Sequence, residues 1–157
     1  MLIFALFKPL NIKKQSFDDV PVFELTSFII YEINTIGLDS IILGTKAIRY
    51  SDRYTISNIN YTDNSQKYIA NIKANSGIYK NDIVNLKGDV VYTREDGLNF
   101  ESDTAKYDKK TSIVSTKSKY RAYNQDHLIV GSSLKYNNIL NKIKSKNVIS
   151  TYQLREK

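Results

Sequence analysis

Several residue types are scarce or missing from this 157-residue chain, and each shortage excludes a class of protein. The chain has no cysteine and one histidine, which excludes a disulfide scaffold, a thiolate zinc site, a cysteine nucleophile and a histidine-rich metal site. It has no tryptophan, two prolines and six glycines, a composition that fits neither collagen nor a coiled coil. What remains is rich in Ile and Tyr, and a hydrophobic content of 41% argues against disorder. The length predicts a single domain.

No catalytic arrangement stands out in the sequence. His127 adjoins Asp126 at a predicted turn, and no Gly-x-Ser-x-Gly segment supplies a nucleophile for it. Four carboxylates surround a predicted hairpin, where solvated charges are normal: Glu95, Asp96, Glu101 and Asp103. We therefore predict a protein that is not an enzyme and that uses no cofactor and no metal.

The positive charge is concentrated in the last third of the chain. Residues 1–105 carry 11 basic and 13 acidic residues, whereas residues 106–157 carry 12 basic and 3 acidic ones. Such a surface attracts nucleic acid, anionic lipid headgroups or phosphorylated sugars, or it is a solvated lysine-rich face. Only five of the 23 basic residues are Arg, and no nucleic-acid-binding motif accompanies them, so we expect no nucleic-acid partner.

The N-terminus begins with a continuous apolar run, residues 1–7, which Lys8 and Pro9 end. Seven residues are too few to cross a bilayer, which takes about 20, and the features of a cleavable signal are missing. The run is either the end of a transmembrane helix that begins upstream or a short lead that packs on the domain or on a partner. We expect the first. Residues 1–8 are then the remnant of a membrane anchor, 9–22 a linker and 23–157 the folded domain.

After Pro21 the chain has the period-two alternation of β-strands. Asp96-Gly97, between two alternating runs, is a strong hairpin signal because Gly readily takes the positive φ of the turn. Weaker turn signals recur at 63–65, 80–82, 108–110, 124–126 and 137–138. Strands joined this tightly must pair antiparallel.

The strands also repeat with a period of about 29 residues. Small residues recur in one column at Gly44, Ala74, Ser102 and Gly131, and in a second, three residues later, at Ala47, Gly77 and Ala105, with Leu134 as the exception. Apolar residues precede the first column by two, and Arg49, Tyr79, Tyr107 and Tyr136 follow the second by two. We interpret this as about four stacked hairpins in one antiparallel sheet, each bending at the same level.

The segments 37–47, 72–79 and 86–90 together resemble the LptC family of lipopolysaccharide-export proteins. Residues 37–47 look like its opening strand pair, and residues 72–79 (Ile-Lys-Ala-Asn-Ser-Gly-Ile-Tyr) are similar to its Leu-x-Ala-x-x-Ala-x-Tyr segment. Residues 86–90 (Leu-Lys-Gly-Asp-Val) resemble its Leu-x-Gly-Asn-Val strand, with a weak echo at 146–148. The likeness covers about residues 28–152.

The resemblance implies an all-β fold, an open, V-shaped β-jellyroll of the kind shared by the LptA-like (OstA-like) bridge proteins. It implies a domain in the periplasm, held by a single-pass anchor in the inner membrane. Such a protein receives lipopolysaccharide from the permease subunits of an inner-membrane ABC transporter at its N-terminal edge. It passes the lipid to a soluble LptA-type bridge protein at its C-terminal edge.

We predict that lipid acyl chains lie between the two halves of the sheet, since burying each methylene contributes about 0.8 kcal/mol. The alternative for each position is an ordinary core residue. The candidate lipid-binding residues are Ile42, Ile72, Ala74, Leu86, Val90, Phe100, Ile129 and Ile143. The candidate partner edge is the last strand, about 139–152, whose every second residue is a lysine on one face: Lys142, Lys144 and Lys146, with Val148.

Two other functions fit the same sequence. One is the soluble LptA-like bridge protein itself, which would carry a cleavable signal. The other is a β-repeat scaffold that binds a polyanion and has no lipid cavity, and whose binding would weaken steeply with salt.

Overall fold

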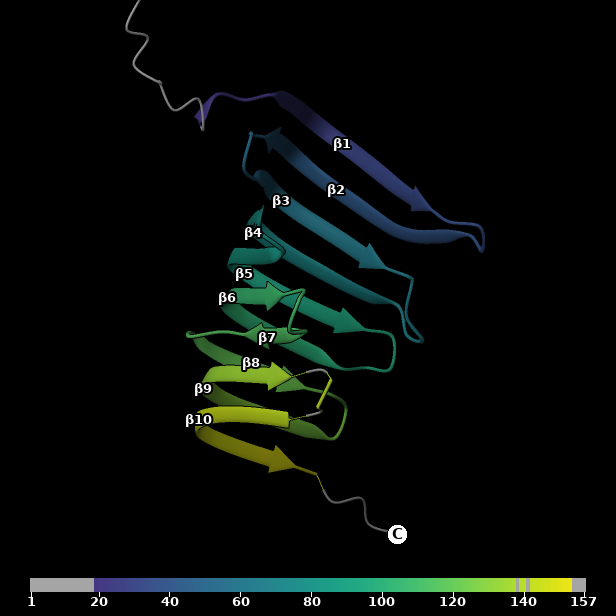
Figure 1. Ribbon diagram of the computed structural model, residues 1–157. Coiled ribbons are helices and arrows are strands. Elements are labelled where there is room, and N and C mark those ends of the chain that lie inside the picture. Colours follow the sequence, from purple (N-terminus) through teal and green to yellow (C-terminus); the bar gives the residue numbers. More distant parts are fainter. Residues whose placement is uncertain (1–18, 138, 141, 154–157) are drawn as a thin grey trace, which may run out of the picture.

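The computed structural model describes residues 19–137, 139–140 and 142–153, and these form one antiparallel β-sheet (Figure 1). The predicted anchor, residues 1–8, and most of the linker lie outside the described residues. The strands are β1 (Phe23–Ile33), β2 (Leu38–Arg49), β3 (Tyr54–Asp63), β4 (Ala70–Lys80), β5 (Ile83–Arg94), β6 (Asn99–Asp108), β7 (Ile113–Ser115), β8 (Lys119–Tyr123), β9 (His127–Asn137) and β10 (Lys142–Tyr152).

The strands are stacked in chain order, as the short connections predicted. The order is β1-β2-β3-β4-β5-β6-β7-β9-β10, and β8 lies in the same lane as β7, between β6 and β9. The Asp96-Gly97 turn joins β5 to β6 as expected: Gly97 has φ +89°, and Arg94 holds the Asp96 carboxylate through two hydrogen bonds of 2.7 Å. Among the described strands, β1 and β10 are the two at the ends of the order, each with one edge that pairs with no other described strand.

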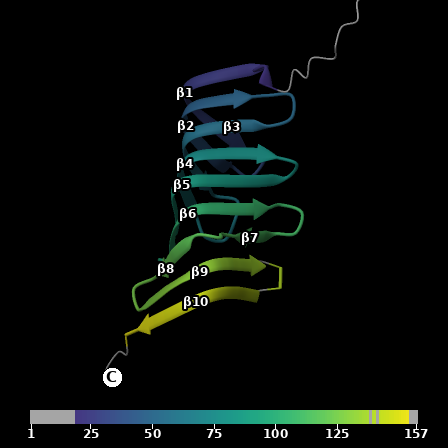
Figure 2. The ribbon, with the colours of Figure 1, turned by 90° about the vertical axis from the view of Figure 1, so that its left-hand side faces the viewer.

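A crease runs across the whole sheet at the level of the small residues, and this confirms the predicted bend. On five strands a residue near the crease has a positive φ: Ser27, Asn58, Asp89, Ser133 and Asn147. Pairing breaks or shifts register around these positions, as at a β-bulge, which bends and twists a strand. The strands therefore curve over on themselves at one side of the sheet (Figures 1 and 2).

The small columns make room where the two halves of the sheet approach each other. A Cβ on Gly44 would lie 2.8 Å from the Phe28 ring and 3.0 Å from Ile56, which belongs to the opposite half. A Cβ on Gly77 would likewise meet Leu86 at 3.2 Å and Ile59 of the opposite half at 3.7 Å. The inner faces of the two halves thus converge at the crease.

One strand of the regular pattern is broken in two. Between β7 and β8 the buried Thr116 accepts a hydrogen bond from the backbone N–H of Ser118 (3.1 Å), and its hydroxyl also contacts those of Ser102 and Thr104. A hydroxyl that bonds a nearby backbone N–H competes with the sheet ladder. The sequence analysis did not predict this break.

Candidate lipid-binding groove

The two inner surfaces of the folded sheet meet at the crease, and we call them the two walls of a candidate groove. The first wall is a row of directly paired residues. Ile42, Ile72, Phe100 and Ile129, which the repeat put in one column, are joined across the strands between them by Tyr61, Tyr92 and Ala122. Directly paired residues project from the same face of a sheet. The row thus makes a continuous, mainly aliphatic and aromatic surface from β2 to β9.

The first wall becomes more exposed toward the end of the sheet. Burial raises the pKa of Tyr61 and of Tyr92, because the ionised phenol is disfavoured where water is scarce. Phe100 stacks on Tyr120 with 5.7 Å between ring centroids. Ile129, near the C-terminal edge, is 36% exposed.

The floor of the groove lies at the crease and is packed protein core. Ala74, Leu86 and Val90 form one buried cluster, and Val90 is only 2% exposed. Four half-buried residues surround the cluster: Ile59, Ile72, Val84 and Ala105. Ala74, Leu86 and Val90 were predicted to bind lipid, but most of their surface is already covered by protein.

The second wall is an equally continuous row of different composition. The directly paired residues are Phe23, Arg49, Tyr54, Tyr79, Val84, Tyr107, Val114, Tyr136 and Ile143. The sequence pattern detected the Arg49 and tyrosine column but gave no role to it. Ile143, which we predicted as a lipid-binding residue, lies at the end of this wall and is 66% exposed.

Acidic side chains at the outer end of the second wall are held by cations and a phenol. Hydrogen bonds from Lys80 and, to a smaller extent, from Arg53 hold the pKa of the Asp52 carboxyl below its usual range. The Tyr79 hydroxyl donates a hydrogen bond to the Asp82 carboxylate over 3.0 Å. This hydrogen bond, together with Lys110, lowers the pKa of Asp82, and it raises the pKa of Tyr79. These carboxylates are therefore ionised at neutral pH.

In the part of the chain that the structure describes, no strand covers either end of the groove. At the N-terminal end the inward side chain of Phe23 is 54% exposed, and at the C-terminal end Val148 is 49% exposed. A second strand paired to β1 or to β10 would extend the groove and cover these side chains.

The predicted partner edge is the outer strand β10, but its lysines are not evenly aligned. Lys142 pairs with Asn137 and Lys144 with Lys135, and the register shifts before Lys146 and again after it. The even alternation expected for these lysines is thus interrupted by bulges near the crease. Bulges and lysines are both common on exposed edge strands.

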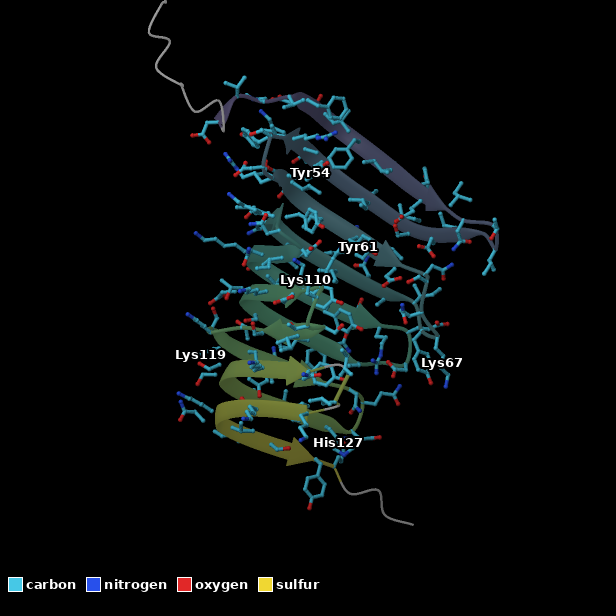
Figure 3. The ribbon with its side chains drawn as sticks, in the orientation of Figure 1. Tyr54, Tyr61, Lys67, Lys110, Lys119 and His127 are labelled. Atoms are coloured by element: carbon cyan, nitrogen blue, oxygen red, sulfur yellow. The ribbon has the colours of Figure 1, made fainter. Side chains whose placement is uncertain are left out.

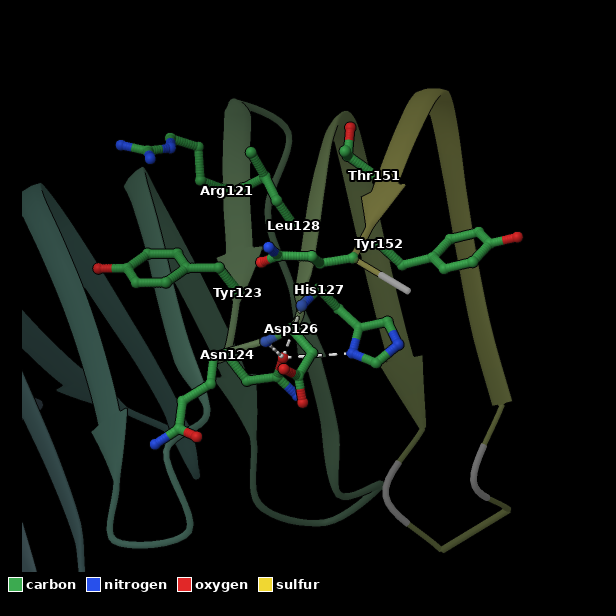
Figure 4. Close-up of a pocket in the computed structure, with 10 residues that line it drawn as sticks. Arg121, Tyr123, Asn124, Asp126, His127, Leu128, Thr151 and Tyr152 are labelled. Atoms are coloured by element: carbon green, nitrogen blue, oxygen red, sulfur yellow. Dashed lines mark hydrogen bonds between the residues drawn. The ribbon is translucent and has the colours of Figure 1, made fainter. Parts of the chain in front are cut away.

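A shallow hollow at the turn between β8 and β9 lies outside the groove (Figure 4). Its lining residues include Arg121, Tyr123, Asn124 and His127, and none of the predicted lipid-binding residues. His127 is the first residue of β9, directly after the predicted turn: its Nδ1 lies 3.3 Å from the Asn124 side-chain oxygen, and its ring stacks on Tyr152. Within the described ranges no three His, Cys, Asp or Glu side chains are grouped so that they could hold a metal ion.

The fold matches that of a lipopolysaccharide-transport protein of known structure. The crystal structure of LptH from Pseudomonas aeruginosa, described as the LptA-homologous periplasmic component of the lipopolysaccharide transport device, superposes with a TM-score of 0.56. The match covers 88% of this chain and 99% of LptH at 10% identity. At this identity the likeness establishes the fold, an LptA-like β-jellyroll.

The sequence itself places the chain in a family. The profile of the family described as "Lipopolysaccharide-assembly, LptC-related" matches residues 8–153. The chain belongs to this LptC family. No curated protein matches the chain. The proteins of the LptC family are components of a lipopolysaccharide transport bridge, not enzymes, as the sequence predicted.

Membership also gives the general location, a domain that faces the periplasm. Within residues 19–137, 139–140 and 142–153, no helix is long and apolar enough to span a membrane.

Proposed function

We propose that this chain is the membrane-tethered component of the lipopolysaccharide export bridge and that it holds acyl chains between the two walls of its groove. One observation carries the proposal: an unbroken inner row of apolar and aromatic side chains runs from β2 to β9. A chain of methylenes can slide along such a row without meeting an unpaired polar group, so its burial stays favourable at each strand.

Photocrosslinking in cells tests the groove. A photoreactive residue is placed at Ile72, Phe100 or Ile129, and at Lys73 as the matched control. Lys73 adjoins Ile72 on β4 but faces outward, where it pairs with Asn60 and Val91. Lipopolysaccharide adducts at the three inner positions and none at Lys73 support the proposal. Adducts at none of the three, in a folded and membrane-associated protein, contradict it.

We propose further that the two open edges meet different partners. The β1 edge receives lipopolysaccharide from the permease subunits of the inner-membrane ABC transporter, and the β10 edge passes it to the soluble LptA-type bridge protein. The support is geometric, because each edge offers unpaired backbone groups beside an exposed inner apolar side chain. The contacts on the β10 side would come from Lys142, Lys144, Lys146 and Val148.

Crosslinkers at the two edges test this polarity. A photoreactive residue at Val148 is expected to capture the soluble bridge protein, and one at Glu24 on β1 the permease subunits. The same partner at both positions, or the reverse assignment, contradicts the proposal. Fractionation tests the tether: the full-length protein is expected in the inner membrane, whereas release with the soluble periplasmic fraction favours the soluble bridge protein instead.

A further inference from the structure

The two walls of the groove are chemically unequal. The first wall presents Ile42, Ile72, Phe100 and Ile129, whereas the row on the second wall contains four tyrosines and Arg49. Tyr54 is 44% exposed, so its ring is available to a ligand on one side. A phenol ring combines an apolar body with a polar tip and suits the boundary between a hydrocarbon region and water.

The turns at the ends of the two walls also differ in charge. The turns that end the second wall (49–54, 80–83, 108–113 and 137–142) carry six basic and three acidic residues. Those that end the first wall (33–38, 63–70, 94–99 and 123–127) carry two basic and four acidic residues. An anion at the mouth of the groove is thus drawn toward the second wall.

In the described part of the chain, three of the six second-wall cations are in salt bridges, and two of the others lie against tyrosines of the inner row. Asp52 and Asp19 pair with Arg53 and Lys80, and Asp82 pairs with Lys110. In contrast, within the described residues neither Arg49 nor Lys109 is in a salt bridge. The Arg49 guanidinium lies 5.5 Å from the centre of the Tyr54 ring, and Lys109 Nζ lies 4.9 Å from that of Tyr79.

These two pairs are also adjacent to each other. Tyr54 and Tyr79 are directly paired residues of β3 and β4, with ring centroids 6.1 Å apart. Figure 3 marks Tyr54 near the N-terminal end of the sheet. Arg49, Tyr54, Tyr79 and Lys109 thus form one cluster at the mouth of the groove. The cluster offers a planar guanidinium that can donate two parallel hydrogen bonds, a flexible ammonium and two aromatic rings.

We infer that this Arg49–Tyr54–Tyr79–Lys109 cluster is a headgroup subsite that takes the phosphorylated saccharide of a glycolipid. The acyl chains then face the first wall, and the lipid has one orientation in the groove. Arg49 and Lys109 contact phosphate, and the tyrosine rings cover the sugar. This inference rests on the proposed function, because a headgroup reaches the cluster only if its acyl chains occupy the groove.

The test compares two forms of one lipid. The affinities of the full chain and of its Arg49→Gln/Lys109→Gln variant are measured for purified lipopolysaccharide and for the same lipopolysaccharide after phosphatase treatment. The double variant is expected to bind the phosphorylated lipid about tenfold more weakly, as the loss of two exposed ionic contacts predicts, and the dephosphorylated lipid as well as wild type does. The affinity of the Arg49→Lys/Lys109→Gln variant for the phosphorylated lipid is expected to lie between those of wild type and the double Gln variant, because Lys keeps the charge but not the planar guanidinium.

Lys67→Gln is the matched control. Lys67 Nζ also lies over a tyrosine, 5.0 Å from the centre of the Tyr68 ring, but at the end of the first wall, so its loss is expected to change neither affinity. An equal loss in Lys67→Gln, or an equal loss for both lipids in the double variant, overturns the headgroup subsite. Displacement of the lipid by millimolar inorganic phosphate at constant ionic strength also overturns it, since the cluster would then be a site for free phosphate.

The failure of the subsite and that of the proposed function are distinguishable. If wild-type protein binds neither lipid and no crosslink forms at Ile72, the groove does not hold lipid and both proposals fail. If both lipids bind and crosslink at Ile72 but the double variant behaves like wild type, only the headgroup subsite fails.

Discussion

Replacing Gly131 by Ala tests whether the crease is held by close packing. A Cβ at this position would lie 2.9 Å from Tyr120 Cε1 and from its hydroxyl, and 3.1 Å from the backbone oxygen of Lys146. Tyr120 is 5% exposed and its hydroxyl lies 2.9 Å from that of Ser145, so the ring cannot turn toward solvent without losing that hydrogen bond. The backbone of β10 cannot yield without disturbing its bulges.

The magnitude follows from three contributions. Overpacking of this kind costs about 1–3 kcal/mol, and loss of the Tyr120–Ser145 hydrogen bond adds about 1 kcal/mol. The smaller backbone entropy of Ala in the unfolded chain offsets about 0.5–1 kcal/mol. We therefore expect Gly131→Ala to lower the free energy of unfolding by about 2 kcal/mol, which urea denaturation measures as a fall of about 1 M in the midpoint.

Gly77→Ala is the control for this prediction. The nearest atom to its Cβ would be the end of the Leu86 side chain at 3.2 Å, with no backbone atom within 4 Å among its three nearest neighbours. A flexible side-chain end can move by a few tenths of an ångström, so the cost is expected to stay under about 1 kcal/mol. If the two variants lose equal stability, or if Gly131→Ala loses none, the crease is not fixed by this contact.

Three further predictions concern stability. Val90→Ala, which removes two methyl groups from a side chain 2% exposed, is expected to cost about 2 kcal/mol by urea denaturation, and a cost under about 0.5 kcal/mol would contradict the packed floor. Thr116→Val leaves the Ser118 N–H without its hydroxyl acceptor at the β7–β8 break and is expected to cost about 1–3 kcal/mol in the same assay; a neutral result would show that the hydroxyl does not shape the break. Because the pKa of Asp82 is lowered in the folded state, its contribution is complete well above 3.8 and is lost as the pH falls through and below that value. Asp82→Asn is therefore expected to flatten the acid limb of a stability-against-pH curve below about pH 4, and an unchanged limb would contradict the bonding to Tyr79.

Much of the fold could be predicted because the local signals agree with one another. Period-two alternation predicts the strands, and Asp96-Gly97 predicts one hairpin. Because the pattern repeats every 29 residues, the same hairpin is predicted at the positions with weaker turn signals. The small columns predicted a bend because small side chains are costly in strands unless space is needed. The break between β7 and β8 was not predicted, since it depends on the Thr116 hydroxyl meeting hydroxyls of a neighbouring strand.

The candidate site could be predicted only in part, and the crease is the reason. Side chains alternate strictly along a flat strand, but the two small columns are three residues apart. The bulge at the crease reverses the alternation, so residues two before the first column and two after the second face the same groove. The apolar column was therefore predicted to face inward, while the tyrosine column opposite it received no role.

The absence of cysteine makes the most direct test of the groove simple, because any single introduced cysteine carries the only thiol. An environment-sensitive fluorophore is attached to Ile72→Cys, on the first wall, and to Lys73→Cys, one residue further on the outer face. When lipopolysaccharide is added to the purified full chain, the account predicts a blue shift of the emission at position 72 and no change at position 73. Equal shifts at both positions, or none at position 72 while the lipid is bound, would contradict the claim that acyl chains lie between the two walls.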